Sequence, residues 1–570
     1  MNNNTYNGFL NIYKESGWTS MDVCAKLRHV LHMKKIGHAG TLDPMAEGVL
    51  PVALGRATKD VDRIGDGVKT YRAGMLLGLE TDTEDITGKV LRTSDGISWP
   101  SEEEIREAVM SFLGDYEQLT PMYSARKVDG KKLYQYAREG KEVERKTKAV
   151  RILDIGIEEI SIPHVRFTVS CTKGTYIRTL CKDIGEKLGC GACMESLTRT
   201  RVGDFTDATA KKIEEIEEAE AAGSIDSLLT VKAPTAVSIG KFDGTHMGHQ
   251  ALMRELRKTA QEHRLKTLVL ILKFGQSGIL TDEERKQKFY DLGIDYCIEL
   301  PFTKDMMNMS AEDFLEKILI GRYSMKAIVA GDDVSFGRGK QGNADFLRAN
   351  AEKYGIIVDL IEKVRIDLSK EPANRVVSVL AESKLAAAKA EKKDPDPCDG
   401  ADGENENGAQ VISSTLLRQE IEKGDMLHVT RLLGAPYAIT GYVVHGRHLG
   451  TERLRIPTMN MKVPPELILP PKGAYAVQAY VADDKGVFDM EHPLHGMSNL
   501  GSRPTVDGSD EHQVMLETHL FDESGDFYGK KVKVELCFFI RPEEKFESLE
   551  ALRQHLEEKD IPAVEAFFAM

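Results

Sequence analysis

Short apolar runs alternate with longer mixed stretches through the middle of this chain. The apolar runs fall at residues 235–240, 267–272, 295–300, 326–331 and 355–361. Stretches of helical character separate them, for example at residues 281–293 and 310–321. Because strands that alternate with helices favour a parallel sheet with helical crossovers, this region predicts a doubly wound, Rossmann-like domain.

The pattern differs on either side of that region. Residues 211–232 predict an acidic helix that closes the first part of the chain and leads into a linker. Partly alternating, β-rich runs occupy residues 437–446, 474–482, 512–521 and 531–540, which is typical of a small β-barrel. We expect three domains, at residues 1–231, 232–434 and 435–570, in a multidomain fold of α+β and α/β parts.

Composition limits what the protein can be. Of its 570 residues, 41% are hydrophobic and 29% charged, which is ordinary for globular domains. The chain has no apolar run of about eighteen residues, so no membrane span is expected. The N-terminus does not resemble a secretory signal, and eight cysteines in so long a chain do not make a disulfide framework. We expect a cytoplasmic protein and infer no obligate protein partner.

One carboxylate in the first domain is placed for chemistry. Asp43 lies in the stretch Gly37–Leu50, between Gly40 and Pro44. Because proline restricts the residue before it, the Asp43 side chain is held in one direction, with His38 close by in the sequence. A carboxylate aimed from a glycine-rich loop suits a nucleophile or a base.

The stretch Gly37–Leu50 resembles the active-site motif of the tRNA pseudouridine synthase B family, which isomerises a T-loop uridine. Further matching segments follow in order at residues 69–73, 78–88, 120–143 and 171–192. Together they cover most of residues 8–205. The resemblance implies a mixed, mostly antiparallel sheet, a tRNA substrate and no metal or cofactor. One departure, Glu15 after Lys14 where the family usually has proline, affects the local loop.

The same resemblance assigns roles to single residues. Asp43 would attack as the nucleophile, and Arg178 would pair with it and hold it ionised. Tyr71 would stack on the base and accept a proton. Tyr176 and Leu197 would line the uracil pocket, and His38 would assist flipping of the nucleotide out of its stack.

A net charge of −14 means that RNA binding must come from a local basic patch. Residues 126–151 are rich in lysine and arginine, with tyrosines between them. Read alone, this stretch would be a solvated surface. Beside an RNA-modifying site, Lys131 and Lys132, together with Lys141, are expected to contact tRNA phosphates.

A glycine-rich turn follows the first strand of the predicted parallel sheet. A turn between strand and helix is where an open α/β sheet binds phosphates, and His246 and His249 lie at the predicted helix start. Residues 240–249 resemble the nucleotidyltransferase motif of bifunctional riboflavin kinase/FAD synthetases, and residues 330–343 and 412–425 match further. This implies that ATP is bound by Gly240, Phe242, Asp243, His246, His249, Ser414, Thr415 and Arg418.

Two departures concern this domain. The segment after residues 267–272 is shorter than the family's loop and lacks its usual Asp-Pro-His-Pro run. Residues 364–411 form an insertion whose second part, rich in Pro, Gly, Asp and Asn, is expected to be disordered. The insertion either loops out or impairs adenylylation, because it ends directly before the phosphate-binding Ser-Ser-Thr segment.

The last region resembles the riboflavin kinase module of the same enzymes, on the strength of Pro457–Asn460 and the stretch Asn499–Gly508. Thr458 and Asn460 would then bind the Mg²⁺ of ATP. Glu517 would take the 5′-hydroxyl proton of riboflavin. Arg455 stands where the family usually has glycine, and it either obstructs the ATP phosphates or binds them.

The whole chain is therefore expected to fuse a tRNA pseudouridine synthase to an enzyme that makes FMN from riboflavin and FAD from FMN. A second hypothesis is a degenerate flavin half that forms only FMN, only FAD or neither, with a first domain that binds and folds tRNA. The intact set of Asp43, Tyr71 and Arg178 argues against that hypothesis for the first domain.

Overall fold

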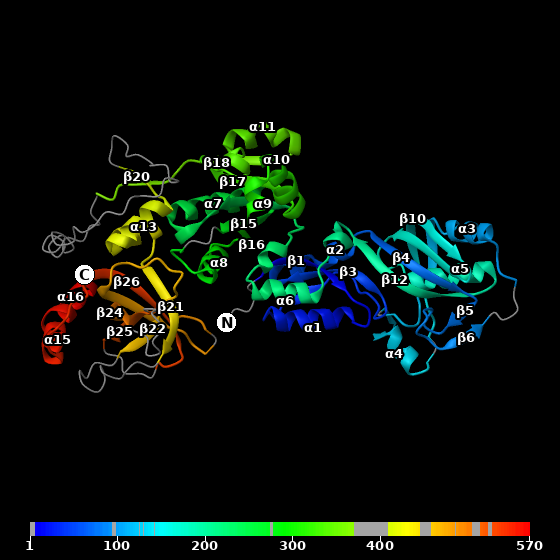
Figure 1. Ribbon diagram of the computed structural model, residues 1–570, viewed down its shortest axis with the longest axis horizontal. Coiled ribbons are helices and arrows are strands. Elements are labelled where there is room, and N and C mark those ends of the chain that lie inside the picture. The colour runs from blue at the N-terminus through cyan, green and yellow to red at the C-terminus, as the bar shows by residue number, and fades with distance from the viewer. Residues whose placement is uncertain are drawn as a thin grey trace. The chain divides into compact units, whose positions relative to one another are not determined.

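The computed structural model describes residues 6–93, 98–124, 126–128, 130–141, 143–273, 277–369, 409–444, 458–484, 486–503, 513–521 and 527–569. The chain divides into two units (Figure 1). One unit comprises Asn3–Ala233 with Arg322–Ser324, and the other contains Pro234–Gly321 and Met325–Met570.

The first unit is built on one mixed sheet. Its strands are β1 (Gly8–Lys14), β2 (Ile36–His38), β3 (Glu47–Leu54), β4 (Lys69–Leu77), β7 (Gly114–Leu119), β10 (Thr147–Ser161), β11 (His164–Cys171), β12 (Ala192–Val202) and β13 (Phe205–Thr206). The order is β1-β3-β12-β4-β11-β10-β7, with β2 on β3 and β13 on β12. Only β3 and β12 pair in parallel among these described strands, which confirms the mixed, mostly antiparallel sheet.

Helices and short hairpins complete this unit. They are α1 (Ser20–Val30), η1 (Gly55–Asp60), α2 (Val61–Gly65), α3 (Glu102–Met110), α4 (Leu133–Arg138), α5 (Ile177–Leu188), η2 (Asp207–Thr209), α6 (Ile213–Ala221) and η3 (Ile225–Leu228). Two hairpins pair β5 (Leu79–Thr81) with β6 (Val90–Thr93) and β8 (Lys127–Val128) with β9 (Lys131–Lys132). Helix α5 packs on β12 and α3 on β10, so their apolar faces form a core with the sheet. The acidic helix expected over 211–232 is shorter, ending at Ala221.

The second unit begins with a parallel sheet in the order β16-β15-β14-β17-β18. Its strands are β14 (Thr235–Gly240), β15 (Lys266–Lys273), β16 (Tyr296–Pro301), β17 (Met325–Gly331) and β18 (Ile357–Ile361). The helical segments are η4 (Asp243–Thr245), α7 (Met247–Glu262), α8 (Asp282–Asp291), α9 (Lys304–Asn308), α10 (Ala311–Asp313), η5 (Phe314–Arg322), η6 (Arg338–Lys340) and α11 (Ala344–Tyr354). The parallel α/β fold is thus confirmed, with strands where the apolar runs predict them.

The described ends of the insertion lie side by side. Strand β19 (Arg365–Ile366) pairs with β20 (Gln410–Val411), and the Ile412 amide donates to the Val364 carbonyl at 2.9 Å. Helices α13 (Ser414–Lys423) and α14 (Met426–Leu433) follow at once. Of the expected insertion, residues 370–408 lie outside the described residues. The two described ends of the insertion are therefore paired directly ahead of α13.

The C-terminal part is a closed barrel in the order β21-β22-β25-β24-β23-β26. Its strands are β21 (Tyr437–Val444), β22 (Met459–Lys462), β23 (Gly473–Val481), β24 (Leu494–Arg503), β25 (Gln513–Leu520) and β26 (Lys531–Pro542). The helical segments α15 (Leu549–His555), η8 (Leu556–Asp560) and α16 (Ile561–Phe568) follow the barrel. The barrel is confirmed, although the sequence pattern did not identify β22 and β24. In the part of the chain that the structure describes, no helix is both long and apolar enough to cross a bilayer.

Candidate active sites

The loop that carries Asp43 joins β2 to β3, and two buried cations donate hydrogen bonds to its main-chain carbonyls. Gly40 has a φ of +89°, a conformation that favours glycine and turns the chain toward Asp43. Lys14 Nζ donates to the carbonyls of Pro44 and Ala46 at 3.2 and 2.5 Å. Arg199, fully buried in β12, donates to the Gly40 carbonyl at 3.1 Å and to those of Thr41 and Val49. The backbone on both sides of Asp43 is therefore fixed.

The Asp43 carboxylate faces a buried guanidinium. Arg178 Nη1 lies 3.3 Å from Asp43 Oδ2 and 3.9 Å from Asp85 Oδ2. Arg178 also donates to the Tyr123 carbonyl. Its side chain is 6% exposed, whereas that of Asp43 is 36% exposed. The arginine is thus locked in the protein, and the carboxylate is open to a ligand.

The other residues expected at this site come from strands β2, β4 and β12 and from the residue before α5. Tyr71 and Leu197 are buried on β4 and β12. Burial raises the pKa of the Tyr71 phenol to about 12, and the positive charge of Arg199 acts against that rise. Tyr176 precedes α5, and its ring centroid lies 5.8 Å from Arg178 Cζ. His38 ends β2; burial, with Arg199 nearby, lowers its pKa.

Sequence reasoning missed Lys14, Asp85 and Arg199 as parts of this site. Each lies in a segment that the motif comparison included or adjoined, but none was assigned a role there. A charged residue at an inward position of a strand or buried turn is the signal that could have identified them. Burial lowers the pKa of Lys14 to about 8, with Asp43 acting in the opposite direction.

The basic stretch forms a hairpin followed by α4. Lys131 pairs with Glu139, and its ammonium lies 4.9 Å from the Tyr136 ring centroid. Lys141 Nζ lies 3.3 Å from the same Glu139 carboxylate. Lys132 is placed on β9, but its side chain lies outside the described part. One glutamate thus partly offsets two of the lysines expected to contact phosphate.

The predicted phosphate turn lies at the carboxyl end of β14, with Gly240 as the last residue of that strand. Phe242 is buried, and its ring contacts His249 edge-on. His246 and His249 are stacked, with ring centroids 3.6 Å apart. Burial lowers the pKa of His246 to about 4 and that of His249 well below its usual value. Both imidazoles are therefore neutral and can each donate one hydrogen bond.

Helix α13 brings its N-terminus to this turn. Ser413 caps the helix, and the Ser414 hydroxyl donates to the Asp243 carbonyl at 3.0 Å. Arg418, one turn further on, pairs with the Asp243 carboxylate. Thr415 lies beside Ser414 in the first turn of α13. The two distant motifs of the sequence thus form one polar surface.

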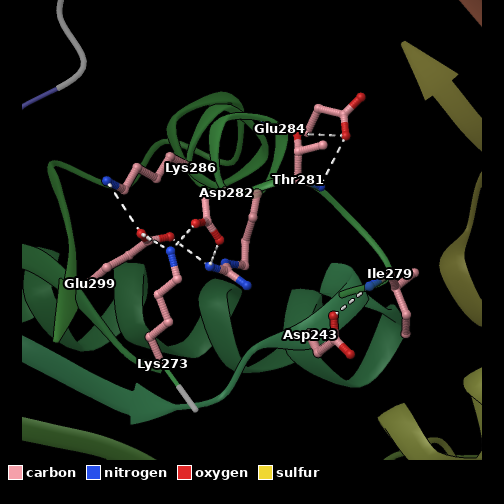
Figure 2. A network of polar contacts seen from close by, with 9 residues as sticks. Asp243, Lys273, Ile279, Thr281, Asp282, Glu284, Lys286 and Glu299 are labelled. Carbon is pink, nitrogen blue, oxygen red and sulfur yellow. Dashed lines mark hydrogen bonds and ion pairs between the residues drawn. The ribbon is translucent and has the colours of Figure 1, made fainter. Parts of the chain in front are cut away.

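A second polar cluster lies at the ends of β15 and β16, as Figure 2 shows. Arg285 Nη2 lies 2.6 Å from both Glu299 Oε1 and Asp282 Oδ1. Lys286 Nζ lies 3.7 Å from Glu299 Oε2, and Lys273 also pairs with Asp282. These charges compensate one another and fix α8 to the edge of the sheet.

In the barrel, three polar residues lie in register across neighbouring strands. Glu517 on β25 is paired with Asn460 on β22 and with Asn499 on β24. Asn460 is buried, and its Oδ1 has no hydrogen-bond partner among the described residues. An unsatisfied buried amide oxygen beside a carboxylate fits a hard cation. Thr458 lies just before β22, whereas Arg455 lies outside the described residues.

Family models match four parts of the chain. Residues 28–177 match the TruB family pseudouridylate synthase N-terminal domain, and residues 178–230 match the tRNA pseudouridylate synthase B C-terminal domain. Residues 229–372 match FAD synthetase, and residues 433–568 match riboflavin kinase.

Relatives agree with the first of these matches. A tRNA pseudouridine synthase B of Alkaliphilus oremlandii is 56% identical over 38% of this chain and 71% of that protein. One of Clostridium acetobutylicum is 50% identical over 37% of this chain and 72% of that protein. A solved structure of a macrolide-efflux protein from Streptococcus pneumoniae is 25% identical, covers 58% of this chain and 94% of its own, and has a TM-score of 0.44. That TM-score is too low to establish a shared overall fold.

The fold and the matches define a multifunctional enzyme in which an isomerase is joined to two transferases. Through residues 28–230 the chain belongs to the tRNA pseudouridine synthase B family, and its remainder combines FAD synthetase and riboflavin kinase modules that use ATP.

Proposed function

We propose that the first domain, residues 1–231, converts a T-loop uridine of tRNA to pseudouridine with Asp43 as its nucleophile. The contact between Asp43 and Arg178 carries this proposal. A carboxylate that is partly open on one side and bound to a fixed cation on the other is held in one direction, as a nucleophile must be. The relatives named tRNA pseudouridine synthase B support tRNA as the substrate.

The reaction exchanges one glycosidic bond for another. The bond from ribose C1′ to uracil N1 breaks, a bond from C1′ to C5 forms, the C5 proton leaves, and N1 gains a proton. Asp43 bonds to C1′ as the bond from C1′ to N1 breaks, and the bond between Asp43 and C1′ breaks in turn when C5 of the detached base attacks C1′. Tyr71 stacks on the base meanwhile. Proton transfer to the Tyr71 oxygen requires a phenolate, and the buried Arg199 cation next to it lowers the cost of that anion.

Around the reacting base, Tyr176 and Leu197 supply the walls of the uracil pocket, and His38 assists flipping. An uncharged His38, favoured by burial, can enter the RNA stack at a lower desolvation cost than a cation. Lys131, Lys132 and Lys141 hold backbone phosphates.

We propose next that residues 232–434 transfer the adenylyl group of ATP to FMN. An FMN phosphate oxygen attacks the α-phosphorus, and pyrophosphate leaves. The neutral His246 and His249 donate hydrogen bonds to the phosphate oxygens, while Ser414, Thr415 and Arg418 hold the phosphates at the start of α13. Gly240 and Phe242 shape the turn.

Residues 435–570 are proposed to phosphorylate riboflavin. The riboflavin 5′-hydroxyl attacks the γ-phosphorus of ATP while Glu517 takes the hydroxyl proton, and ADP leaves. Thr458 and Asn460 would hold Mg²⁺, which offsets the charge of the ATP phosphates when bound. A cytoplasmic location is proposed because eight cysteines in 570 residues are too few for a disulfide framework.

The synthase proposal is tested with Asp43→Asn. We expect loss of tritium release from tRNA labelled at uridine C5, by roughly 10³-fold or more, with tRNA binding retained. Asp66→Asn is the matched control, because Asp66 is an exposed carboxylate that also pairs with a cation, Lys173. Turnover by Asp43→Asn at the wild-type rate would refute the nucleophile.

The flavin proposals are tested by supplying riboflavin, ATP and Mg²⁺ and following FMN and FAD by chromatography. Formation of both supports the proposal. FMN without FAD indicates an inactive adenylyltransferase, and neither product indicates a degenerate flavin half.

A further inference from the structure

The proposed phosphate-binding turn after β14 has a strained backbone that depends on contacts with its surroundings. Phe242 and Thr245 have φ values of 49° and 46°, and Gly244 between them has 80°. Residues other than glycine rarely adopt such angles, and they persist only when surrounding structure enforces them. A Cβ added at Gly244 would lie 2.9 Å from Leu417 Cδ2 and 3.0 Å from Ile279 Cδ1. The turn is therefore pressed between α13 and the segment that precedes α8.

Asp243, inside that turn, is bonded to both neighbours. Its Oδ1 accepts the Ile279 amide at 2.8 Å, as Figure 2 shows. Its Oδ2 accepts Arg418 Nε at 3.0 Å and Nη2 at 2.5 Å. Its main-chain carbonyl accepts the Ser414 hydroxyl at 3.0 Å. One residue thus joins the three segments that meet at the phosphate surface.

The segment on the Ile279 side is also fixed by the kinase barrel. The Gly278 amide donates to the Glu466 carbonyl, and the Ile468 amide donates to the Gly278 carbonyl, both at 2.8 Å. Ile279 is fully buried in one core with barrel residues such as Leu467. Arg418 reaches this segment too, donating to the Ser277 carbonyl at 2.9 Å. Asp243 and Arg418 therefore hold the turn against a support that the barrel keeps in place.

The chemistry of Asp243 argues against direct contact with ATP. Both carboxylate oxygens are already engaged, and the side chain is only 10% exposed. A carboxylate placed against phosphates would repel them. Arg418, in contrast, is 31% exposed and carries the charge that phosphates attract.

We propose that Asp243 is a positioning residue of the adenylyltransferase, which aims Arg418 at the ATP phosphates and ties the phosphate turn to helix α13. This inference rests on the proposed function of residues 232–434. It revises the expectation that Asp243 itself binds ATP.

The test is a double-mutant cycle of Asp243→Asn and Arg418→Gln in the full chain, supplied with FMN and ATP. Asparagine keeps an acceptor for the Ile279 amide but removes the charge that orients Arg418. We expect Asp243→Asn to raise the KM for ATP in FAD formation and to lower kcat/KM by about 10- to 100-fold. The double variant should be no worse than Arg418→Gln alone, because Asp243 acts through Arg418.

Controls within the same chain separate this from misfolding. Riboflavin phosphorylation should be unchanged in Asp243→Asn. Asp345→Asn, which removes an exposed aspartate paired with Arg348, should leave FAD formation unchanged. If Asp243→Asn does not fold, Arg418→Gln, whose fold is checked by retained riboflavin phosphorylation, must still lose ATP affinity.

Three results would overturn the inference. A lower KM for ATP in Asp243→Asn would mean that the carboxylate faces the phosphates. A multiplicative loss in the double variant would mean that the two residues act independently, and an unchanged Asp243→Asn would remove its role. ATP affinity is measured in the same cycle without turnover, so a wild-type chain that forms no FAD would refute the proposed function while still testing this inference.

Discussion

In each of the proposed synthase and adenylyltransferase sites an aspartate faces an arginine, but in one site the arginine is the more buried partner and in the other the aspartate is. In the first, Arg178 is 6% exposed and Asp43 is 36% exposed. In the second, Asp243 is 10% exposed and Arg418 is 31% exposed. The buried partner in each case makes further bonds to the protein, and the exposed partner is open to a ligand. The difference accords with the proposed roles, in which a carboxylate attacks an electrophilic ribose carbon and a guanidinium binds phosphate.

The comparison predicts that removing the buried partner costs stability as well as activity. Arg178→Gln leaves Asp43 without its cation and Asp85, also buried, with an uncompensated charge. We expect pseudouridine formation to fall by roughly 10²- to 10³-fold and unfolding free energy by about 2–4 kcal/mol. Asp43→Asn should lose activity with little change in melting temperature. Both quantities are measured on the same preparations, by tritium release and thermal unfolding.

Equal melting temperatures for Arg178→Gln and Asp43→Asn would contradict the expectation that the buried partner contributes more to stability. The second pair offers a further test, since Asp243→Asn, which removes the more buried partner, should also lower the melting temperature.

The kinase site extends the comparison to a carboxylate flanked by amides. Glu517 lies in register between Asn460 and Asn499. Glu517→Gln should lower FMN formation by roughly 10²-fold or more, because the hydroxyl proton then has no base. FAD formation from supplied FMN should persist and serves as the control. FMN formation at the wild-type rate would exclude Glu517 as the base.

The Asp43 carboxylate cannot itself attract the tRNA phosphates, so the proposed contacts with the tRNA backbone lie in the basic stretch. Reversal of charge at Lys131, Lys132 and Lys141 should weaken tRNA binding several-fold and flatten its dependence on salt. Glu139→Gln is the informative partner, because it frees Lys131 and Lys141 from their shared carboxylate and should strengthen binding. An unchanged salt slope in the lysine variant would remove this segment from the RNA interface.

The pair of Glu420 and His428 also joins a buried partner to a more exposed one, and no role in binding a substrate is proposed for it. Glu420 is 6% exposed, and His428 Nδ1 lies 3.1 Å from it and from Asp425. The hydrogen bond to Glu420 raises the pKa of His428. The stabilisation that this interaction gives to the folded state is therefore fully present below the usual histidine pKa. It is lost as the pH rises through the raised pKa of His428.

Between about pH 6 and pH 8, the melting temperature of the wild type should fall by about one or two degrees more than that of His428→Gln. Parallel pH profiles for the two proteins would show that this pair contributes nothing to stability. FAD formation should be unaffected by the substitution, in contrast to the variants of Asp243.

The sequence predicts most of the framework but not the supports beneath the sites. Mostly apolar runs mark β14 to β17 because a strand covered on both faces carries few polar residues. Strand β24, with Gly496, Ser498 and Gly501, has weak β propensity and exists because the barrel closes around it. The family resemblance implies that Arg178 pairs with Asp43, and in the structure the two side chains lie 3.3 Å apart.

Arg199 and Lys14 escaped notice for a physical reason. Arg199 lies between two threonines on β12, and Lys14 ends β1 directly before Glu15, so the polar neighbours of each predict a solvated residue. Their function depends on main-chain carbonyls of the Asp43 loop, and no residue pattern records where those carbonyls point.

The short ladder of β19 and β20 has a practical consequence. Because β19 and β20 pair with each other directly ahead of α13, the two ends of the insertion stay together whatever the length of chain between them. We expect replacement of residues 370–408 by a tight turn or by a reporter domain to leave α13 in place, which makes this point of the chain suitable for engineering.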